Sequence, residues 1–278
     1  MQFRDSLVWI TGASSGIGEA LIAPLAARGA RVAISARRAD RLEALASDHR
    51  RRGADVRAFP LDVTDREANA RAVEAIEREM GPIALAVLNA GSHLRGSGGV
   101  FDAQQYVDIF HLNVLGVVYG LDAVLPRMLA RGDGHIAGVA SLAGFRALPT
   151  AAAYGASKAA LIHLLESIRF DLEPRGVRVT VVNPGFVETP LTDQNRFRMP
   201  FLMPVERAAG IIVRELERDR REIHFPKPFS WTVKLLRILP FPLYARVIWL
   251  ASRGRRAAHA HPPREREAAR GTDAPRGE

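Results

Sequence analysis

A tyrosine and a lysine stand four positions apart in the stretch Tyr154-Gly155-Ala156-Ser157-Lys158. On a helix this spacing places both side chains on one face. An ammonium beside a phenol favours the phenolate and lowers the phenol pKa from its usual value of about 10. Such a pair suits general acid/base catalysis, in which the phenol passes a proton to a carbonyl oxygen while hydride reaches the carbon. The pattern Tyr-x-x-x-Lys also occurs by chance on protein surfaces, so it needs support from other positions.

Two further polar residues are placed to assist this chemistry. Ser141 follows an apolar run, and its hydroxyl could hold and polarise a substrate carbonyl. Asn113 lies inside a helical stretch between apolar neighbours, where asparagine is unfavourable unless it has a buried hydrogen-bonding role. The alternative for Asn113 is a local packing hydrogen bond. The catalytic candidates are therefore Asn113, Ser141, Tyr154 and Lys158.

A glycine-rich segment, Thr11-Gly12-Ala13-Ser14-Ser15-Gly16-Ile17-Gly18, follows the first apolar run and opens the first helical stretch. Glycines allow a tight turn and let backbone N–H groups approach a pyrophosphate, and the helix N-terminus adds partial positive charge. The spacing is G-x-x-x-G-x-G rather than the commoner G-x-G-x-x-G. The segment predicts a dinucleotide site, and the alternative is a glycine turn that binds nothing.

The end of the second apolar run, Ser35-Ala36-Arg37-Arg38, contains no acidic residue. An acid at this place would bind the adenosine ribose hydroxyls and repel a 2′-phosphate. Arginine instead offers a fixed fork of donors that suits phosphate. We therefore expect NADP rather than NAD, with Arg37 as the main phosphate contact and Arg38 as a second. The alternative is two solvated arginines at the start of a helix.

Short apolar runs and helical stretches alternate over residues 1–225, a pattern that predicts an α/β fold. The runs are almost continuously apolar, as strands covered on both faces should be. The predicted strands are Leu7–Ile10, Arg31–Ala36, Val56–Leu61, Ile83–Leu88, His135–Ala140, Val177–Val182 and a weaker Glu222–Phe225. The predicted helices are Gly16–Arg28 with a kink at Pro24, Ala39–Arg52, Asp65–Met80, Ala103–Ala130, Ala151–Glu173 and Val205–Arg218. We expect a Rossmann-like, doubly wound parallel sheet of about seven strands with helices on both faces.

Composition excludes several classes of protein. The 278 residues include no cysteine, which rules out disulfide scaffolds, thiolate metal sites and cysteine nucleophiles. The histidines lack metal-ligand spacing, so we expect no metal site. The net charge is +9, but residues 223–264 hold eight basic and no acidic residues, so the rest is nearly neutral. A nearly neutral body disfavours a nucleic-acid partner. The N-terminus lacks the pattern of a secretory signal, so a cytoplasmic location is expected.

The composition changes after residue 225. Residues 226–250 are apolar, aromatic and basic, with prolines that divide them into pieces too short for a membrane span of about 20 residues. They resemble an amphipathic element lying on an anionic membrane surface. The alternative is packing against the catalytic domain or a neighbouring subunit. Residues 251–278 contain little to bury and are predicted to be disordered. The expected organisation is therefore 1–225, 226–250 and 251–278.

Together these positions give the chain a resemblance to the classical short-chain dehydrogenases/reductases over about residues 5–225. The match is an ordered set at the strand and helix ends that this family requires: Thr11–Gly18, Leu61-Asp62-Val63, Asn89-Ala90-Gly91, Asn113, Ser141, Tyr154-x-x-x-Lys158 and Asn183-Pro184-Gly185. One small departure is Leu88, where many members have a second asparagine. The family's proteins are usually dimers or tetramers joined through the two long helices, here 103–130 and 151–173.

The resemblance implies a role for each matching residue. Tyr154 would be the acid/base, Lys158 would bind the nicotinamide ribose and lower the tyrosine pKa, Ser141 would orient the substrate, and Asn113 would hold a water of the proton relay. Cofactor contacts are implied for Gly12, Ser14, Ser15, Gly16, Ile17 and Gly18 near the pyrophosphate, Arg37 and Arg38 at the 2′-phosphate, Asp62 and Val63 beside the adenine, Asn89, Ala90 and Gly91 on the ribose side, Tyr154 and Lys158, and Pro184, Gly185, Val187 and Thr189 beside the nicotinamide. Asn-Ala-Gly could equally be a simple turn, and Asp62 a helix cap, although Thr64 and Asp65 are better placed for capping.

The expected function is NADP(H)-dependent oxidoreduction of a carbonyl or secondary alcohol. Residues 186–204 correspond to the family's mobile lid, and their apolar side chains favour an apolar or lipid-like substrate. The alternative for the lid is a loop that only covers its own core. Arg196 and Arg198 could meet an anionic group or only water. The alternative function is a non-catalytic NADP-binding sensor or scaffold on the same fold, although such a protein would be expected to lose Tyr154 or Lys158.

Overall fold

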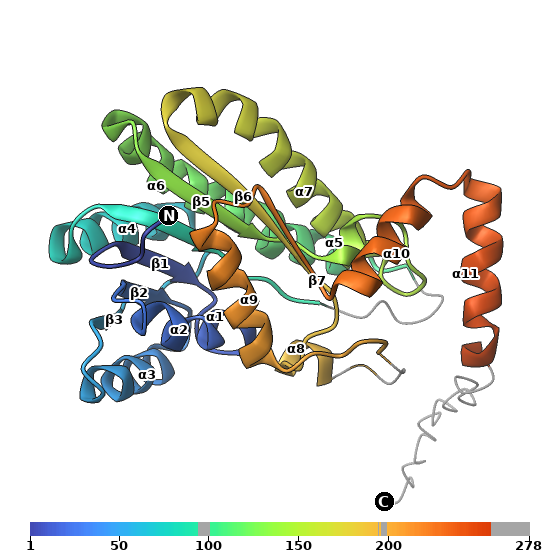
Figure 1. Cartoon of the computed structure of the whole chain (residues 1–278), viewed down its shortest axis with the longest axis horizontal. Helices are drawn as coiled ribbons and strands as arrows, with labels where there is room; N and C mark the ends of the chain where they lie inside the picture. The colour runs from blue at the N-terminus through green and yellow to red at the C-terminus, as the bar shows by residue number, and fades with distance from the viewer. Residues whose placement is uncertain (94–100, 194, 196–198, 257–278) are drawn as a thin grey trace, which may run out of the picture. The chain divides into compact units, whose positions relative to one another are not determined.

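The computed structural model describes residues 1–93, 101–193, 195 and 199–256, with side chains placed up to residue 250. Among these residues, seven parallel strands form one sheet in the order β3-β2-β1-β4-β5-β6-β7 (Figure 1). The strands are β1 Leu7–Thr11, β2 Arg31–Ser35, β3 Val56–Ala58, β4 Ile83–Leu88, β5 Gly134–Val139, β6 Val177–Pro184 and β7 Glu222–Phe225. The predicted doubly wound sheet is confirmed.

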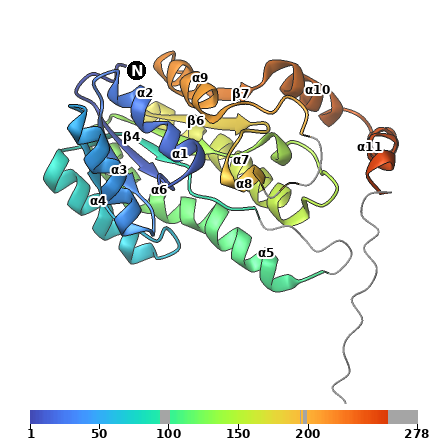
Figure 2. The ribbon, with the colours of Figure 1, turned by 90° about the horizontal axis from the view of Figure 1, so that it is seen from below.

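Helices cover both faces of the sheet, and each face has its own hydrophobic core (Figure 2). One face is covered by α4 (Arg66–Met80), α6 (Gly116–Arg131) and α7 (Ala152–Leu172). The other is covered by α1 (Gly16–Ala20), α2 (Ile22–Ala26), α3 (Ala39–Arg51) and α9 (Val205–Glu217). The remaining segments are α5 (Ala103–Phe110), η1 (His111–Leu115), η2 (Leu142–Gly144), η3 (Glu173–Arg175), α8 (Pro190–Asp193), α10 (Lys227–Arg237) and α11 (Phe241–Arg256).

Most predicted elements match the observed ones to within two residues at each end, and the two larger differences both involve proline. The helix expected at Gly16–Arg28 is divided into α1 and α2, because Pro24 has no N–H to bond the carbonyl of Ala20. The strand expected at Val56–Leu61 ends at Ala58, just before Pro60. Phe59 and Leu61 still donate backbone hydrogen bonds to Ile34 and Ala36 at 2.8 and 3.0 Å. The chain therefore continues along β2 beyond β3.

Residues Ala103–Arg131 form one continuous helical segment through α5, η1 and α6. By length and composition alone this segment is apolar enough to cross a membrane. Its residues Val117, Leu121, Val124 and Met128 are buried in the core beneath the sheet, where such apolarity is expected. The five residues of η1 form a π-helical turn, which places Asn113 in the widened part of the helix.

The chain divides into a compact unit at Met1–Leu239 and a second unit that begins at Pro240. The first unit includes α10. Residues 226–239 of the predicted extension 226–250 are therefore part of the same unit as the sheet. In the second unit, α11 runs from Phe241 to Arg256 and so continues past Leu250, while the predicted disorder of residues 251–278 stays a prediction. The rest of the predicted tail, including His259 and His261, lies outside the described residues.

Candidate active site

The sequence-predicted site residues meet at the carboxyl ends of β1, β4, β5 and β6. The strand order reverses direction between β1 and β4, since β2 and β3 lie on one side and β5 to β7 on the other. In open α/β sheets this reversal opens a crevice at the carboxyl edge where ligands bind. Glycine-rich residues come from the turn after β1, and polar residues come from the turns after β4 and β5 and from α7. The sheet therefore assembles cofactor and catalytic candidates at one place.

Tyr154, Lys158 and Ser141 lie together. Ser141 Oγ caps η2 by accepting from the backbone N–H of Ala143 at 3.1 Å, and it shares a hydrogen bond with the Tyr154 hydroxyl. Lys158 is buried, and its Nζ lies 5.9 Å from the centroid of the Tyr154 ring. The ammonium donates to the carbonyl oxygen of Val139, the last residue of β5, at 2.8 Å. This contact fixes the lysine against the strand that leads to Ser141.

Burial sets the protonation of the pair. Burial raises the pKa of Tyr154 above its usual 10.0, and the hydrogen bond with Ser141 offsets only part of that rise. Burial lowers the pKa of Lys158 from 10.5 to about 8. Burial therefore outweighs the lowering expected from a nearby cation, and the pKa of Tyr154 is raised where the sequence predicted it to be lowered. The ammonium is directed at Val139 rather than at the phenol oxygen, and burial reduces its own charge.

Asn113 is completely buried, and its amide group joins three parts of the site. Its Nδ2 donates to the carbonyl of Ser92 and to Ser157 Oγ, each at 3.0 Å, and its Oδ1 accepts from the N–H of Ser92 at 2.8 Å. Ser157 Oγ in turn donates to the carbonyl of Tyr154 at 2.8 Å. The side chain thus has the packing role left open by the sequence, and it ties the turn after β4 to α7.

Close packing holds the Ser141 turn against α7. A Cβ on Gly144 would lie 2.8 Å from the carbonyl carbon of Lys158 and 2.9 Å from the backbone nitrogen of Ala159. A Cβ on Gly155 would lie 3.1 Å from the carbonyl oxygen of Ala143. Only glycine lets η2 and α7 approach this closely. The approach brings Ser141 within hydrogen-bonding reach of Tyr154.

Replacing Gly144 by alanine is expected to destabilise the fold by about 1–3 kcal/mol and to lower turnover, because the new methyl must displace backbone atoms of α7. Gly210→Ala is the matched control: a Cβ on Gly210, in α9, would meet no atom within 4 Å, so alanine should raise stability by about 0.4–1 kcal/mol. Chemical denaturation and turnover of both variants measure these effects. A Gly144→Ala protein of unchanged stability and activity would refute the packing argument.

The glycine-rich turn is shaped by two residues in left-handed conformation, Gly12 at φ 67° and Gly16 at φ 58°. A Cβ on Gly18 would lie 2.5 Å from the carbonyl oxygen of Gly12 and 2.6 Å from Asn89 Nδ2. Asn89 Nδ2 donates to the carbonyls of Thr11 and Gly12 at 3.0 and 3.3 Å. Glycine at position 18 therefore lets the start of α1 pack directly on the turn after β1 and on Asn89, the close packing that a dinucleotide-binding glycine cradle needs.

The remaining residues of the two turns have clear positions. Ser15 precedes the first residue of α1, Ser14 is buried, and Ile17 packs against the second core. The N–H groups of Asn89 and Ala90 both donate to Thr11 Oγ1, at 3.0 and 3.2 Å. A Cβ on Gly91 would lie 3.3 Å from Lys158 Nζ. The turn after β4 thus connects the glycine-rich turn to the catalytic candidates.

Three arginines follow the end of β2 and lie around the start of α3: Arg37, Arg38 and Arg41. Arg37 is exposed, whereas Arg38 Nη2 donates to the carbonyl and hydroxyl of Ser14, both at 3.0 Å. Arg41, which the sequence interpretation missed, also donates to the carbonyl of Ser14 and pairs with Glu19 at 2.7 Å. Arg41 could have been found from the sequence because it lies about one helical turn after Arg38, at the start of α3. Arg37 makes none of these contacts with Ser14, and it lies close enough to Asp62 for its charge to lower the pKa of that carboxyl.

Asp62 forms a turn with Thr64 shortly after β3. Its Oδ1 accepts from the N–H and hydroxyl of Thr64 at 3.0 and 2.7 Å. Burial alone would raise the pKa of Asp62, but these hydrogen bonds and the charge of Arg37 lower it overall. Asp65, not Asp62, caps α4, by accepting from Ala68. Val63 is buried against the start of α6, where a Cβ on Gly116 would lie 2.9 Å from its Cγ2.

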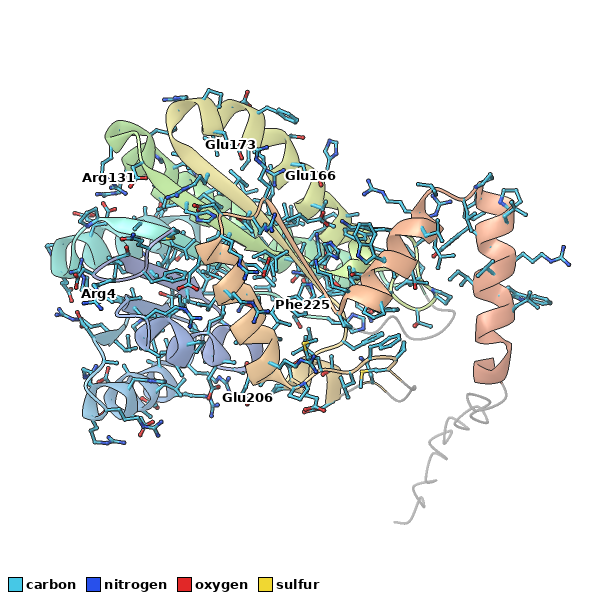
Figure 3. All side chains as sticks on the ribbon, in the orientation of Figure 1. Arg4, Arg131, Glu166, Glu173, Glu206 and Phe225 are labelled. Carbon is cyan, nitrogen blue, oxygen red and sulfur yellow. The ribbon has the colours of Figure 1, made fainter. Side chains whose placement is uncertain are left out.

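The residues after β6 lie over the glycine-rich turn. A Cβ added to Gly16 would lie 3.2 Å from Thr189 Cγ2, so Thr189 is the nearest side chain on that side of Gly16. Pro184 ends β6, and Gly185 donates its N–H to the carbonyl of Phe225, the buried residue labelled in Figure 3, at 2.7 Å. Val187 pairs with Met203 in a short bridge that closes the base of the lid. The residues predicted beside the nicotinamide are thus adjacent to those predicted at the pyrophosphate.

Three phenylalanines gather beside this segment. The rings of Phe186 and Phe229 stack at 5.8 Å between centroids, and Phe201 lies 6.2 Å from Phe229. Phe186 and Phe201 come from the lid, but Phe229 comes from α10. We call Phe186, Phe201 and Phe229 the aromatic wall. The lid residues Arg196, Phe197 and Arg198 lie outside the described residues.

The sequence interpretation missed several residues that the structure brings to the site: Ser92, His93, Ser157, Arg41 and Gly144. The His93 ring lies edge-on to the Tyr154 ring, with 4.7 Å between centroids. Its position shortly after Asn89-Ala90-Gly91 was the only signal. Ser157 could have been found from its place in the Tyr-x-x-x-Lys segment. Within the described part of the chain, no group of three or more histidines and acids is placed to hold a metal ion.

Comparisons with known proteins agree with this arrangement. A sequence model described as short chain dehydrogenase matches residues 6–199. The chain is 41% identical over 249 residues to an uncharacterized oxidoreductase of Myxococcus xanthus, covering 88% of this chain and 96% of that protein. A short chain dehydrogenase/reductase from Burkholderia phymatum in complex with NAD superposes with a TM-score of 0.77 at 25% identity, covering 84% of this chain and 94% of that one.

A second solved structure is similar to the same degree. The alcohol dehydrogenase of the archaeon Thermococcus sibiricus, complexed with 5-hydroxy-NADP, superposes with a TM-score of 0.71 at 26% identity, covering 79% of this chain and 94% of that one. The neighbours thus include both NAD and NADP complexes. The family match spans more than half of the chain, and the relative from Myxococcus is aligned over nearly its whole length. The chain is an oxidoreductase of the short-chain dehydrogenase family.

Proposed function

We propose that this protein is an NADP(H)-dependent oxidoreductase that transfers hydride between the nicotinamide and a carbonyl or secondary alcohol. The observation that carries the proposal is the convergence of Ser141, Tyr154 and Lys158 beside the turn of Gly12, Gly16 and Gly18. A glycine cradle at a helix N-terminus fits a pyrophosphate, and a buried phenol next to a hydroxyl fits proton exchange with a carbonyl oxygen.

The residues present fit a dinucleotide. The cradle of α1 would hold the pyrophosphate, Asp62 would serve the adenine side, and Lys158 and Thr189 would hold the nicotinamide half. The bound nicotinamide supplies or accepts the hydride. The side chains of this protein perform the remaining work: Ser141 holds the substrate oxygen, and Tyr154 donates a proton to that oxygen in reduction or removes it in oxidation.

The raised pKa of Tyr154 keeps its hydroxyl protonated at neutral pH. A protonated phenol is ready to act as an acid, so reduction needs no prior ionisation of the free enzyme. Oxidation requires the phenolate, and we expect it to become faster as the pH rises. Lys158 Nζ, held by Val139, is the cation within the site that would favour the phenolate.

We propose NADP rather than NAD as the cofactor, on the basis of Arg37. Its guanidinium is exposed at the end of β2, whereas Arg38 and Arg41 bond to Ser14. We expect Arg37→Ser to raise KM for NADPH by about tenfold to a hundredfold, because charge-assisted contacts to a phosphate are lost. NADH lacks that phosphate and serves as the internal control. Steady-state kinetics with both cofactors measure the effect, and an equal change in KM for NADH would contradict the assignment.

We propose an apolar or lipid-like substrate. The aromatic wall borders the segment predicted beside the nicotinamide, and two of its rings come from the lid. Apolar side chains around a few polar groups are typical of sites for apolar ligands. The protein is further proposed to act as a homodimer or homotetramer through α5, η1, α6 and α7, on whose surface Val107, Leu115 and Phe170 are exposed.

The test is the loss of reduced nicotinamide absorbance with a panel of ketones, from small polar compounds to long-chain acyl and steroid-like ones. NADPH and NADH are compared in parallel. The proposal predicts NADPH oxidation that is fastest with a bulky apolar ketone. Cofactor binding without turnover of any ketone would instead favour a non-catalytic sensor on the same fold.

A further inference from the structure

Helix α10 carries two different faces. Its inner residues Ser230 and Val233 are buried, and Phe229 belongs to the aromatic wall. On the opposite side, Trp231, Leu235 and Ile238 are 61%, 63% and 75% exposed. These three occupy positions i, i+4 and i+7, so they form one stripe along the helix. We call Trp231, Leu235 and Ile238 the outer stripe.

The catalytic unit holds α10 firmly, so the outer stripe is a defined surface. Lys234 pairs with Glu222 of β7 at 2.6 Å, and its Nζ also lies 5.7 Å from the Phe145 ring. Arg146 donates to the carbonyls of Arg237 and Leu239 at 3.3 and 3.2 Å. His224 Nδ1 and Ser230 Oγ are 2.7 Å apart. Because Ser230 donates to the carbonyl of Lys227, His224 must be the donor to Ser230.

The charged side chains of α10 itself have a single sign. Lys227, Lys234 and Arg237 are basic, and the helix contains no acidic residue. Lys227 and Arg237 are exposed at the two ends of α10. An exposed row of tryptophan, leucine and isoleucine flanked by cations is the composition of helices that lie in a membrane interface. Each basic residue near an anionic bilayer adds further attraction.

We propose that the outer stripe of α10 binds the surface of an anionic lipid bilayer. A second copy of the chain is the less suitable occupant. A two-fold interface places the same surface of both copies face to face, so the cations of one helix would meet those of the other. An anionic membrane surface complements both the apolar row and the charge.

Co-sedimentation of the full chain with vesicles tests this proposal. One vesicle preparation contains phosphatidylcholine alone, and the other contains phosphatidylcholine with phosphatidylglycerol. We expect binding to the anionic vesicles that weakens as salt increases. The variant Trp231→Ser/Leu235→Ser/Ile238→Ser should lower the partition coefficient by about tenfold or more, because it removes most of the apolar area that enters the interface.

Phe101→Ser is the matched control. Phe101 is 75% exposed just before α5, outside the basic segment, so its removal should leave vesicle binding unchanged. Thermal denaturation of both variants verifies that they are folded. No binding of the wild-type chain to anionic vesicles would overturn the proposal. Undiminished vesicle binding by the triple variant would also overturn it. Loss of self-association in the triple variant, together with no vesicle binding by the wild-type chain, would overturn it as well.

Discussion

Tyr154→Phe is expected to lower turnover by about 10²–10⁴-fold, the usual contribution of a positioned acid/base. The substitution removes one oxygen, the one that shares a hydrogen bond with Ser141. The ring and its contact with His93 at 4.7 Å remain, so the packing around the ring is kept. The affinity for NADPH should change little, because the glycine-rich turn is untouched. Turnover with the best ketone and titration of NADPH binding measure the two effects separately.

Tyr106→Phe is the control for this experiment. Tyr106, in α5, stacks on Phe101 with 4.6 Å between ring centroids, outside the group around Ser141. Its loss of a hydroxyl should leave turnover unchanged. A Tyr154→Phe protein that reduces the ketone at the wild-type rate would remove the tyrosine from the proposed chemistry. The same conclusion would follow if both variants lost activity equally.

Lys158→Met is expected to lower activity and, at the same time, to change how stability depends on pH. The buried ammonium has a pKa of about 8, against an ordinary value of 10.5 in the unfolded chain. Below pH 8 the lysine is protonated in both states, and the full cost of burying its charge is present. Between pH 8 and 10.5 the folded state is neutral while the unfolded state still holds the proton, so the free energy of unfolding rises with pH.

The size of this rise follows from the two pKa values. The shift from 10.5 to about 8 corresponds to about 3 kcal/mol, which the wild-type protein should gain over that range and Lys158→Met should not. Denaturant unfolding of both proteins at a series of pH values measures the difference. Lys227→Met, which removes an exposed lysine, should follow the wild-type curve. Parallel curves for wild type and Lys158→Met would contradict the burial of a charged lysine.

Much of the fold could be predicted because its signals are local. Continuous apolar runs bounded by helical stretches specify a covered parallel sheet, and the runs at Ile83–Leu88 and Glu222–Phe225 match β4 and β7 at both ends. The glycine-rich turn and the Tyr-x-x-x-Lys spacing are likewise local. Each predicts its own geometry without knowledge of the rest of the chain.

The remaining features depend on contacts between distant segments. Nothing near Gly144 in the sequence shows that α7 approaches it within contact distance, and nothing near Phe229 shows that it will stack on Phe186. The pKa of Tyr154 was predicted in the wrong direction for the same reason. Spacing places Lys158 on the correct face of the helix, but only the fold shows the ammonium bound to Val139 and both groups buried.

The proposed role of Arg37 also depends on its surroundings. Sequence alone treats Arg37 and Arg38 as similar, with Arg37 placed first. In the structure, Arg38 is bonded to Ser14, while Arg37 is exposed and lies close enough to Asp62 to lower the pKa of that carboxyl. This difference makes Arg37 the sharper target for the cofactor test.

The central claim is transfer of hydride from a nicotinamide to a carbonyl carbon, and an isotope experiment tests it most directly. The full chain is incubated with NADPH deuterated at the transferable position of the nicotinamide and with the best ketone of the panel. We expect deuterium on the carbinol carbon of the alcohol product, as detected by mass spectrometry, and none with Tyr154→Phe over the same time. Alcohol that carries no deuterium from either face of the nicotinamide, or NADPH that binds and is never oxidised, would contradict the account.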